Sequence, residues 1–433
     1  MKIKDIAHYV TEKIPVVQIS TSTYIGMDNM IPNRGGVVPS EYLPEDGYAI
    51  SFRKGDVLLG NIRPYFKKIW LATFDGGCSQ DVLCLRSNGD VSPEFLYCCL
   101  AQDSFFDYDV KGAKGSKMPR GDKDHILEFP IIDIKDKNRA GKFVDTITKK
   151  IETNNALSSK LEGLARMIYN YWFLQFDFPD ENGKPYKSSG GKMVWNDELK
   201  REIPEGWRVQ PLSHFIAYSK NGDWGNEKPK KASDICVNCF RGADFASITN
   251  DYHMTAPVRY IGVKNEDRLL ADGDLVTEIS GGSPTQATGR IGYINKGFLS
   301  RSKNSMTCSN FCKAFTPYDK NYQYWLYQTW KSFYDMGAMF NYESKTTGIK
   351  NLMFDEFVTW NKVPEPNREL VMLYQKEIDL YYGKIQSLLI ENQELASLHD
   401  FLLPLLMNGQ VTFKDKDLSN ANEWAGYVRG LSR

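Results

Sequence analysis

The chain has 433 residues, a formal net charge of zero and 25% charged residues. Its length exceeds the usual range of a single domain, so we expect two or three domains, each with its own core. Zero net charge excludes a basic field over the whole molecule, although basic residues gathered on one face can still bind nucleic acid. We find no signal peptide and no run of about 18 apolar residues that would span a membrane. The eight cysteines are therefore expected to stay reduced in the cytoplasm.

Residues 1–133 are predicted to form a first globular domain of α+β type. Three short β-rich runs between residues 56 and 86 are separated by Gly-Asp, Arg-Pro and Gly-Gly turn signals. Ser92 and Pro93 then predict the start of a helix, because serine is a favoured N-cap and proline is tolerated in the first turn. Phe129-Pro130 leads from this domain into a long helical segment.

The central feature of the sequence is a long helical pattern that occurs twice. An offset of 234 residues pairs Lys150 with Lys384 and Leu161 with Leu395. In both copies, mostly apolar residues recur at alternating steps of four and three, which is typical of two helices packed along a shared seam. The predicted seam residues are Ile147, Ile151, Leu161, Ile168, Ile385, Leu388, Asn392, Leu395 and Leu402.

We place the two helices at residues 134–176 and 364–410. Each would be about 50 Å long, a length that suits a spacer better than a core element. Asn392 on the seam indicates a fixed register, since an interior asparagine specifies register at a cost in stability. The alternative interpretation is a pair of long helices inside an ordinary globular core.

The remaining segments follow the same two-fold plan. Residues 177–204, rich in Pro, Gly, Ser and Lys, are interpreted as a surface linker, and residues 205–363 as a second α+β domain. Lys54-Gly55-Asp56 in the first domain resembles Asp272-Gly273-Asp274 in the second at an offset of 218. Since this offset differs from that of the helices, insertions have collected in the globular parts. Residues 411–433 form a polar C-terminal tail.

Motifs of common catalytic sites are missing from the sequence. It contains no GxxxxGK[ST] phosphate loop, no HExxH, no GxSxG and no Asn-Pro-Pro-aromatic tetrapeptide of the kind that amino-methyltransferases use. The pairs Cys236/Cys239 and Cys308/Cys312 could supply four thiolates to zinc, but the gap between the pairs is longer than in compact zinc modules. We favour ordinary reduced cysteines, so no catalytic or metal-binding residue is predicted.

Basic and polar loops carry the strongest functional signal. Residues 111–123 hold five basic residues against one acidic residue, and residues 61–68 interleave aromatic with basic side chains. The corresponding loops of the second domain, 280–290 and 345–350, are rich in Gly, Ser, Thr and Lys. Such side chains make phosphate and base-edge contacts. The candidate DNA-binding residues are Arg63, Tyr65, Lys67, Lys68, Lys111, Lys114, Lys117, Arg120, Ser283, Thr285, Gln286, Arg290, Lys345, Thr347 and Lys350.

Taken together, these features resemble the specificity (S) subunit of a type I restriction-modification system. The resemblance extends over nearly the whole chain and rests on the order of several short motifs within the two-fold repeat. These motifs are Lys54–Asp56, Phe129-Pro130, Leu161–Ala165, Trp172-Phe173, Ile203–Trp207, Asp272–Asp274 and Leu402–Val411. The first domain departs from the pattern, because it begins without the Pro-Glu-Gly-Trp lead-in found at Pro204–Trp207.

The resemblance implies an α+β fold in which two pseudo-symmetric target recognition domains, each of mixed β-sheet and helices, are joined by two long antiparallel coiled-coil helices. Each domain would read one half of a bipartite site in double-stranded DNA. The helices would set the spacing and dock two DNA methyltransferase (M) subunits, with restriction/translocase (R) subunits as further partners. The chain itself would be non-catalytic and hold no cofactor, since S-adenosylmethionine, ATP and Mg are expected on the partner subunits.

Two other functions stay open from the residues alone. One is a two-headed adaptor that binds proteins, and the other is a zinc-dependent DNA-acting enzyme that uses Cys236, Cys239, Cys308 and Cys312. Bound metal in the isolated chain would favour the enzyme. Failure to bind any duplex, even with partner subunits present, would favour the adaptor.

Overall fold

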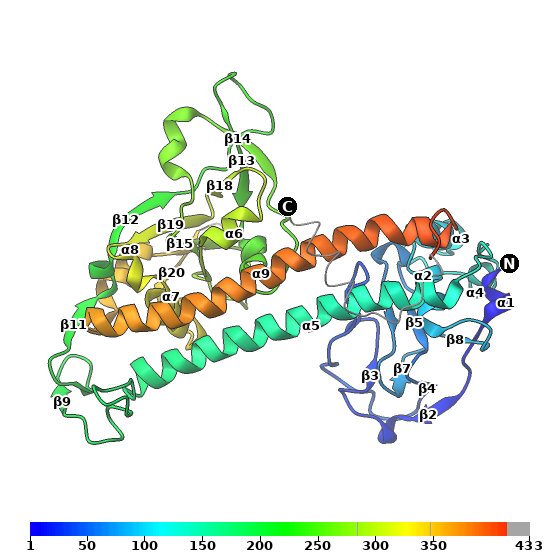
Figure 1. Cartoon of the computed structure of the whole chain (residues 1–433), viewed down its shortest axis with the longest axis horizontal. Helices are drawn as coiled ribbons and strands as arrows, with labels where there is room; N and C mark the ends of the chain where they lie inside the picture. The colour runs from blue at the N-terminus through cyan, green and yellow to red at the C-terminus, as the bar shows by residue number, and fades with distance from the viewer. Residues whose placement is uncertain (284, 347, 414–433) are drawn as a thin grey trace. The chain divides into compact units, whose positions relative to one another are not determined.

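The computed structural model describes residues 1–283, 285–346 and 348–413 of the chain (Figure 1). The chain divides into two compact units, which we call unit 1 and unit 2. Unit 1 is formed by Met1–Lys150 with the chain from Leu395, and unit 2 by Ile151–Glu394. Both units combine helices with β-sheets, which confirms the expected mixture of helix and sheet.

Two long helices, α5 (Lys137–Tyr169) and α9 (Arg368–Met407), each contribute residues to both units. A π-helical turn at Asn170–Leu174 continues α5, and α9 contains Pro404 near its end. Among the residues that the structure describes, no helix combines the length and the apolar character that a membrane span requires.

Within unit 2 the two long helices pack against each other in opposite directions (Figure 1). The rings of Trp172 and Phe173, just after α5, lie 5.9 and 5.0 Å from the ring of Tyr374, near the start of α9. Further back along α5, Asn154 donates a hydrogen bond of 2.8 Å to Asn392. The two helices are therefore antiparallel within unit 2.

Unit 1 contains two four-stranded sheets. The first is antiparallel and has the order β1 (Ala7–Tyr9), β8 (Val82–Ser87), β5 (Val57–Gly60) and β6 (Ile69–Leu71). The second has the order β2 (Lys13–Pro15), β4 (Tyr48–Phe52), β7 (Gly76–Cys78) and β3 (Tyr24–Ile25), with β3 and β7 parallel. The β-rich runs expected between residues 56 and 86 are confirmed as β5, β6 and β8.

Short helices complete unit 1. They are α1 (Ile3–Ile6), α2 (Pro93–Leu100), α3 (Asp103–Gly112) and α4 (Lys123–Leu127), with 3₁₀ turns at Val16–Gln18 and Pro64–Phe66. The predicted helix start is confirmed, because the Ser92 hydroxyl accepts a hydrogen bond of 3.3 Å from the Phe95 amide. One cluster of buried apolar residues, which includes Val57, Leu59 and Phe95, joins the first sheet to α2.

Unit 2 is built on an antiparallel sheet with the order β12 (Ile216–Asn221), β19 (Cys312–Pro317), β15 (Leu275–Glu278) and β17 (Ile291–Tyr293). Unit 2 also contains two three-stranded sheets. The first has the order β14 (Val258–Ile261), β13 (Ile235–Phe240) and β18 (Ser305–Cys308). The second has the order β16 (Ser280–Gly281), β21 (Ile349–Leu352) and β20 (Glu343–Thr346). Two further pairs are β9 (Met193–Asn196) with β10 (Arg201–Pro204) and β11 (Arg208–Pro211) with β22 (Lys362–Glu365).

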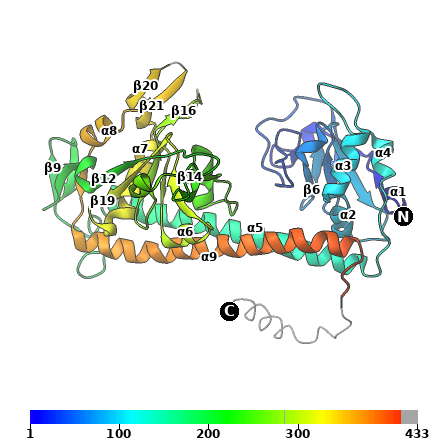
Figure 2. The same ribbon diagram turned by 90° about the horizontal axis from the view of Figure 1, so that it is seen from above.

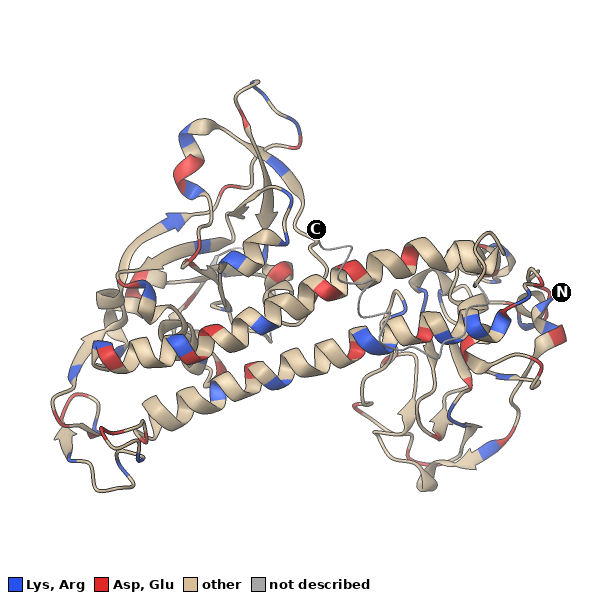
Figure 3. Cartoon of the chain, in the orientation of Figure 1, with Lys and Arg blue, Asp and Glu red and all other residues tan. Residues whose placement is uncertain are grey.

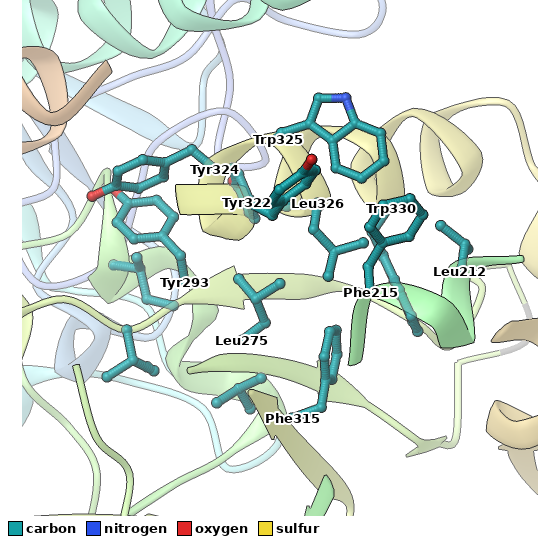
Figure 4. Packing of buried hydrophobic residues seen from close by; sticks show 14 of the residues in the cluster. Leu212, Phe215, Leu275, Tyr293, Phe315, Tyr322, Tyr324, Trp325, Leu326 and Trp330 are labelled. Carbon is teal, nitrogen blue, oxygen red and sulfur yellow. The ribbon is translucent and has the colours of Figure 1, made fainter. Parts of the chain in front are cut away.

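The core of unit 2 lies between its four-stranded sheet and α7 (Gln323–Asp335). Trp330 of α7 packs on Phe315 of the sheet with 5.3 Å between ring centroids, and Leu275 lies beside them (Figure 4). Burial of one such side chain stabilises the fold by about 1.5–3 kcal/mol. The other helical elements are α6 (Lys296–Ser300), α8 (Phe354–Trp360) and 3₁₀ segments at Leu212–Phe215, Gly242–Ile248, Val263–Arg268, Lys320–Tyr322 and Ala338–Tyr342.

The four-stranded antiparallel sheets of the two units share one strand order, β1-β8-β5-β6 in unit 1 and β12-β19-β15-β17 in unit 2. Just before the third strand of each, Gly55 and Gly273 have left-handed φ angles of 94° and 104°, a conformation that favours glycine. The aspartates that follow them, Asp56 and Asp274, are 2% and 1% exposed. The Gly-Asp signatures seen in the sequence are therefore structural turns.

The two buried aspartates obtain their countercharges from different strands. Asp56 accepts two hydrogen bonds of 2.8 Å from the guanidinium of Arg86, on β8. Asp274 accepts hydrogen bonds from the ammonium of Lys220, on β12, at 2.7 Å and from the hydroxyl of Thr316, on β19, at 2.5 Å. The carboxylate at this position is thus neutralised by an arginine in unit 1 and by a lysine in unit 2.

Residues 177–204, interpreted from composition as a surface linker, contain more regular structure than expected. They include the β9–β10 hairpin, and the ring of Phe178 stacks on those of Tyr186 and Trp207 at 4.7 and 5.5 Å. Composition did not predict this regular structure, because the aromatic residues that pack together occur singly among Gly, Ser and Lys.

Candidate functional site

In unit 1, the two segments predicted to bind DNA lie next to each other. The amide of Arg63 donates a hydrogen bond of 2.7 Å to the carbonyl of Pro119, and a β-bridge joins the residue before it to Arg120. Residues 61–68, which we call loop 1, therefore contact residues 114–120, which we call hairpin 1.

In unit 2, the two predicted segments also meet. β16 pairs with β21, so that Ser280 faces Asn351 and Gly281 faces Lys350, and β21 pairs with β20 as a hairpin. We call residues 280–290 loop 2 and residues 343–352 hairpin 2. Figure 2 shows hairpin 2 at the end of unit 2 that lies away from α9. A polar loop and a distant hairpin thus form one surface in each unit.

Loop 1 also interlocks with an earlier turn that sequence reasoning missed. The amides of Asn33 and Arg34 donate hydrogen bonds of 2.8 and 2.9 Å to the carbonyls of Phe66 and Lys67. Asn33, Arg34, Lys67 and also Arg63 have left-handed φ angles between 52° and 62°, which is uncommon outside glycine. Such strain persists only where surrounding contacts enforce it, and it concentrates at functional sites. The Asn-Arg-Gly-Gly run of this turn is the signal that could have revealed it.

Two of the predicted DNA-binding lysines in loop 1 hold the loop in place. Lys67 donates a hydrogen bond of 2.7 Å to Asp103, which also accepts one from Arg34, and these bonds hold the pKa of Asp103 below its usual range. The ammonium of Lys68 donates to the carbonyl of Met27 at 2.5 Å. Both lysines therefore support the loop that carries them.

The cations at hairpin 1 are more accessible. Lys114 and Arg120 form exposed ion pairs with neighbouring aspartates, and such pairs are readily exchanged for a phosphate. Lys111 and Lys117 are exposed and have no partner among the described residues. Figure 3 shows that Lys and Arg are interspersed with Asp and Glu along the chain.

Exposed apolar side chains accompany these cations. The rings of Tyr65 and Phe66 lie 4.8 Å apart and are 49% and 38% exposed, and Met118 in hairpin 1 is 50% exposed. Contacts to sugars and to thymine methyl groups need such groups beside the phosphate-binding cations. The surface of loop 1 and hairpin 1 can therefore offer both kinds of contact.

Beneath hairpin 1 lies a buried acid that the sequence did not reveal. Asp109 of α3 is 0% exposed, and neither of its carboxyl oxygens, nor the side-chain oxygen of Asn61, has a hydrogen-bond partner in the described part of the chain. A Cβ added to Gly121 would lie 2.5 Å from Asp109 Oδ1 and 3.0 Å from Asn61 Oδ1, so this position requires glycine. Burial raises the pKa of Asp109 to about 6.

In loop 2, the predicted residues divide into exposed and anchored groups. Thr285 and Gln286 are exposed, and the Ser283 hydroxyl accepts a hydrogen bond of 3.1 Å from the Gln286 amide. Arg290, by contrast, donates two hydrogen bonds of 2.9 and 2.8 Å to the carboxylate of Glu278, which is 8% exposed. Arg290 is therefore held by a structural ion pair.

Hairpin 2 contains the remaining three candidates. Lys350 is 8% exposed, and its ammonium contacts Glu343 and the carbonyl of Gln286, both at 3.1 Å. Lys345 belongs to β20, and the structure describes the backbone of this lysine but not its side chain. Thr347 lies outside the described residues. The structure thus places Lys350 under the hairpin and away from its surface.

The four cysteines considered for zinc are free thiols, and three of them are buried. Among residues 1–283, 285–346 and 348–413, no group of three or more His, Cys, Asp and Glu side chains could hold a metal ion. Burial raises the pKa of both Cys239 and Cys312 to about 12. The Cys308 thiol donates to the Cys312 carbonyl at 3.7 Å, as a structural contact.

The predicted seam residues lie on the long helices with different degrees of burial. Four are buried in the structure: Ile147, Ile385, Leu388 and Asn392. The others are partly buried: Ile151, Leu161, Ile168, Leu395 and Leu402. Asn392 has hydrogen-bond partners on α5, namely Asn154 and Asn155, each at 2.8 Å.

We compared the sequence and the fold of the chain with those of known proteins. No protein-family model matches the sequence. The fold is similar to the crystal structure of a type I restriction-modification system S subunit from M. genitalium, with a TM-score of 0.57, 16% identity and coverage of 96% of each chain. The type I restriction enzyme HindI specificity subunit of Haemophilus influenzae is 22% identical over 420 residues, which cover 83% of this chain and 87% of that protein.

The chain is similar in sequence to type I restriction enzyme specificity subunits. A second relative, the type I restriction enzyme MjaIX specificity subunit of Methanocaldococcus jannaschii, is 27% identical over 169 residues, which cover 38% of this chain and 36% of that protein. The resemblance seen in the sequence is thereby confirmed. Both relatives are named as specificity subunits of type I restriction enzymes.

Proposed function

We propose that this chain is the DNA-reading subunit of a type I restriction-modification complex. Loop 1 with hairpin 1 reads one half of a bipartite site, and loop 2 with hairpin 2 reads the other. The observation that carries this proposal is the repeated pairing of a polar loop with a hairpin that is distant in sequence. Each pairing presents side chains from two segments on one surface, which suits readout of base edges in the major groove.

The long helices are proposed to act as an antiparallel coiled coil that sets the gap between the half-sites. A helix of about 35 residues is about 50 Å long, enough to relate major-groove sites about one turn, or 34 Å, apart. In this scheme the chain consists of target recognition domains at 1–133 and 205–363, helices at 134–176 and 364–410, a linker at 177–204 and a tail at 411–433.

Two exposed apolar pairs on the helices support the docking of two M subunits. On α5, Leu164 and Met167 are 44% and 63% exposed, and on α9, Leu398 and Phe401 are 42% and 66% exposed. The repeat offset of 234 relates the pairs, since 164 + 234 = 398 and 167 + 234 = 401. Large apolar side chains exposed together mark interaction surfaces, and two equivalent surfaces suit two copies of one partner. S-adenosylmethionine, ATP and Mg would then belong to the M and R subunits.

Methylation mapping tests this proposal directly. The chain is co-expressed with its M subunit in an unmodified host, and methyladenine is mapped across the host genome, with the M subunit alone as the control. A new two-part motif with a fixed gap, present only with this chain, is the expected result. A soluble complex that produces no new methylation would overturn the proposal.

A further inference from the structure

We infer that the buried pair Glu343–Lys350 is a positioning element that fixes hairpin 2 against loop 2, and that Lys350 acts through this contact instead of binding DNA. The inference rests on the proposed function and deepens it, because it separates the residues that touch DNA in unit 2 from those that hold the reading surface in place. Charge alone made Lys350 a candidate for DNA contact.

The carboxylate of Glu343 ties the hairpin to the loop. Its Oε1 atom accepts hydrogen bonds from the amide of Thr288 at 2.7 Å and from the hydroxyl of Thr288 at 3.1 Å. Its Oε2 atom lies 3.1 Å from the ammonium of Lys350, and the Glu343 side chain is only 4% exposed. One side chain of β20 therefore holds both loop 2 and β21.

The ammonium of Lys350 is enclosed by the same elements. It donates a hydrogen bond of 3.1 Å to the carbonyl of Gln286 in loop 2, and it lies 5.1 Å from the ring centroid of Phe340. The Lys350 side chain is 10% exposed. A cation with partners on this many sides does not extend to a phosphate outside the protein.

Exposed reading residues depend on this anchor through the chain. Thr285 and Gln286 are exposed, and the bonds of the pair fall on the Gln286 carbonyl and on Thr288. Removal of one member of a buried ion pair leaves the other charge uncompensated, so loop 2 would move to solvate it. In unit 1 a backbone hydrogen bond between Arg63 and Pro119 connects loop 1 with hairpin 1.

Salt dependence of DNA binding separates positioning from phosphate contact. Lys350→Met, Glu343→Gln and the double variant are measured in the complex with M subunits, on a duplex that carries the mapped site, at several salt concentrations. Lys117→Met is the reference, because loss of one phosphate contact lowers the slope of log K against log salt by about 0.9. We expect Lys350→Met to weaken binding about tenfold or more with an unchanged slope. The double variant should recover most of the affinity, because the unpaired buried carboxylate is gone.

Hydrogen exchange supplies a readout that does not involve DNA. The amide of Thr288, bonded to Glu343 in the wild type, should exchange faster in Lys350→Met and regain protection in the double variant. A slope lowered as in Lys117→Met, with no recovery in the double variant and unchanged exchange at Thr288, would overturn the inference. If the wild-type complex binds no bipartite site, the proposed function fails, while the exchange measurement still decides whether the pair anchors loop 2.

Discussion

Asn154 of α5 and Asn392 of α9 are hydrogen-bonded to each other at 2.8 Å, and their side chains are 2% and 0% exposed. Asn154 also donates to Glu391 at 2.9 Å, and Asn392 donates to Asn155 at 2.8 Å. A buried polar network stabilises a fold only while its members are paired. The antiparallel packing of the helices provides this pairing at one register.

Replacement of Asn392 by Leu should therefore destabilise the chain. It removes the bond between Asn154 and Asn392, so that Asn154 keeps only its bond to Glu391 in this network, and it removes the donor to Asn155. An unsatisfied buried polar group costs about 1–3 kcal/mol. The double variant Asn154→Leu/Asn392→Leu should regain part of this loss, because the two buried amides are replaced by apolar groups, while Asn155 still lacks its donor. Urea unfolding of the variants as a double-mutant cycle measures the coupling. Ser158→Ala is the control, since its buried hydroxyl has no partner in the described part of the chain, and an Asn392→Leu variant as stable as this control would contradict the prediction.

Asp109 should make the stability of unit 1 depend on pH. Its pKa in the folded chain is about 6, above the value of about 3.9 for an unfolded chain, so the folded state binds more protons between these values. This contribution is complete below about pH 4 and is lost as the pH rises through 6, by about 2–3 kcal/mol.

The variant Asp109→Asn tests this dependence, because an amide fills the same space and does not titrate. Compared with the wild type, it should be more stable at pH 8, with the difference shrinking towards pH 4.5, as measured by urea unfolding. The charge of His125 opposes the pKa shift of Asp109, and this interaction is present in the wild type and absent in Asp109→Asn. A difference in stability that does not change with pH would show that Asp109 is ionised throughout this range.

Two glycines of α5 should respond oppositely to alanine. A Cβ at Gly141 would lie 2.4 Å from the amide nitrogen of Phe95 and 2.8 Å from its Cα atom, so Gly141→Ala should cost about 1–3 kcal/mol by overpacking. A Cβ at Gly163 meets nothing within 4 Å, so Gly163→Ala should gain up to about 1 kcal/mol through helix propensity. Thermal unfolding of the two variants compares them directly, and equal effects would mean that Phe95 does not pack on α5 as described.

The exposed lysines near hairpin 1 should contact phosphates. Replacement of Lys111 and Lys117 by Gln should weaken DNA binding and lower the salt slope by about 2, because each phosphate contact contributes about 0.9. Lys67→Gln is a matched control, since Lys67 is bonded to Asp103 and should affect affinity without changing the slope. Binding titrations of the complex at several salt concentrations measure both quantities. An unchanged slope in the double variant would remove hairpin 1 from the DNA interface.

Local and periodic signals in the sequence were sufficient for several elements. Ser92 predicted a helix N-terminus because a cap depends only on the next three residues, and the four-three spacing predicted α5 and α9 because a helix repeats its contacts at that period. The loops that meet in each unit were identified by their composition, although their adjacency depends on strand pairing that composition does not encode.

Side-chain roles within those loops were harder to predict, for a physical reason. Lys350 and Arg290 have the charge of DNA-binding residues, but their acidic partners Glu343 and Glu278 lie in other strands or turns, and only the folded hairpin and sheet bring them together. Asp109 shows the converse, because nothing in its helix indicates that both carboxyl oxygens will be buried without partners. Burial of a charge depends on what covers it, and that is a tertiary property.

The different neutralisation of Asp56 and Asp274 limits which pieces of this chain can be recombined. The strand registers place Arg86 of unit 1 and Thr316 of unit 2 at equivalent positions. A chimera that received only the strand with Arg86 in unit 2 would crowd two cations onto one carboxylate, because Lys220 is already there. If unit 1 received the strand with Thr316 in place of the strand with Arg86, Asp56 would be left without a cation. The strands that hold an aspartate's hydrogen-bond partners must therefore be exchanged together with the strand that the aspartate precedes.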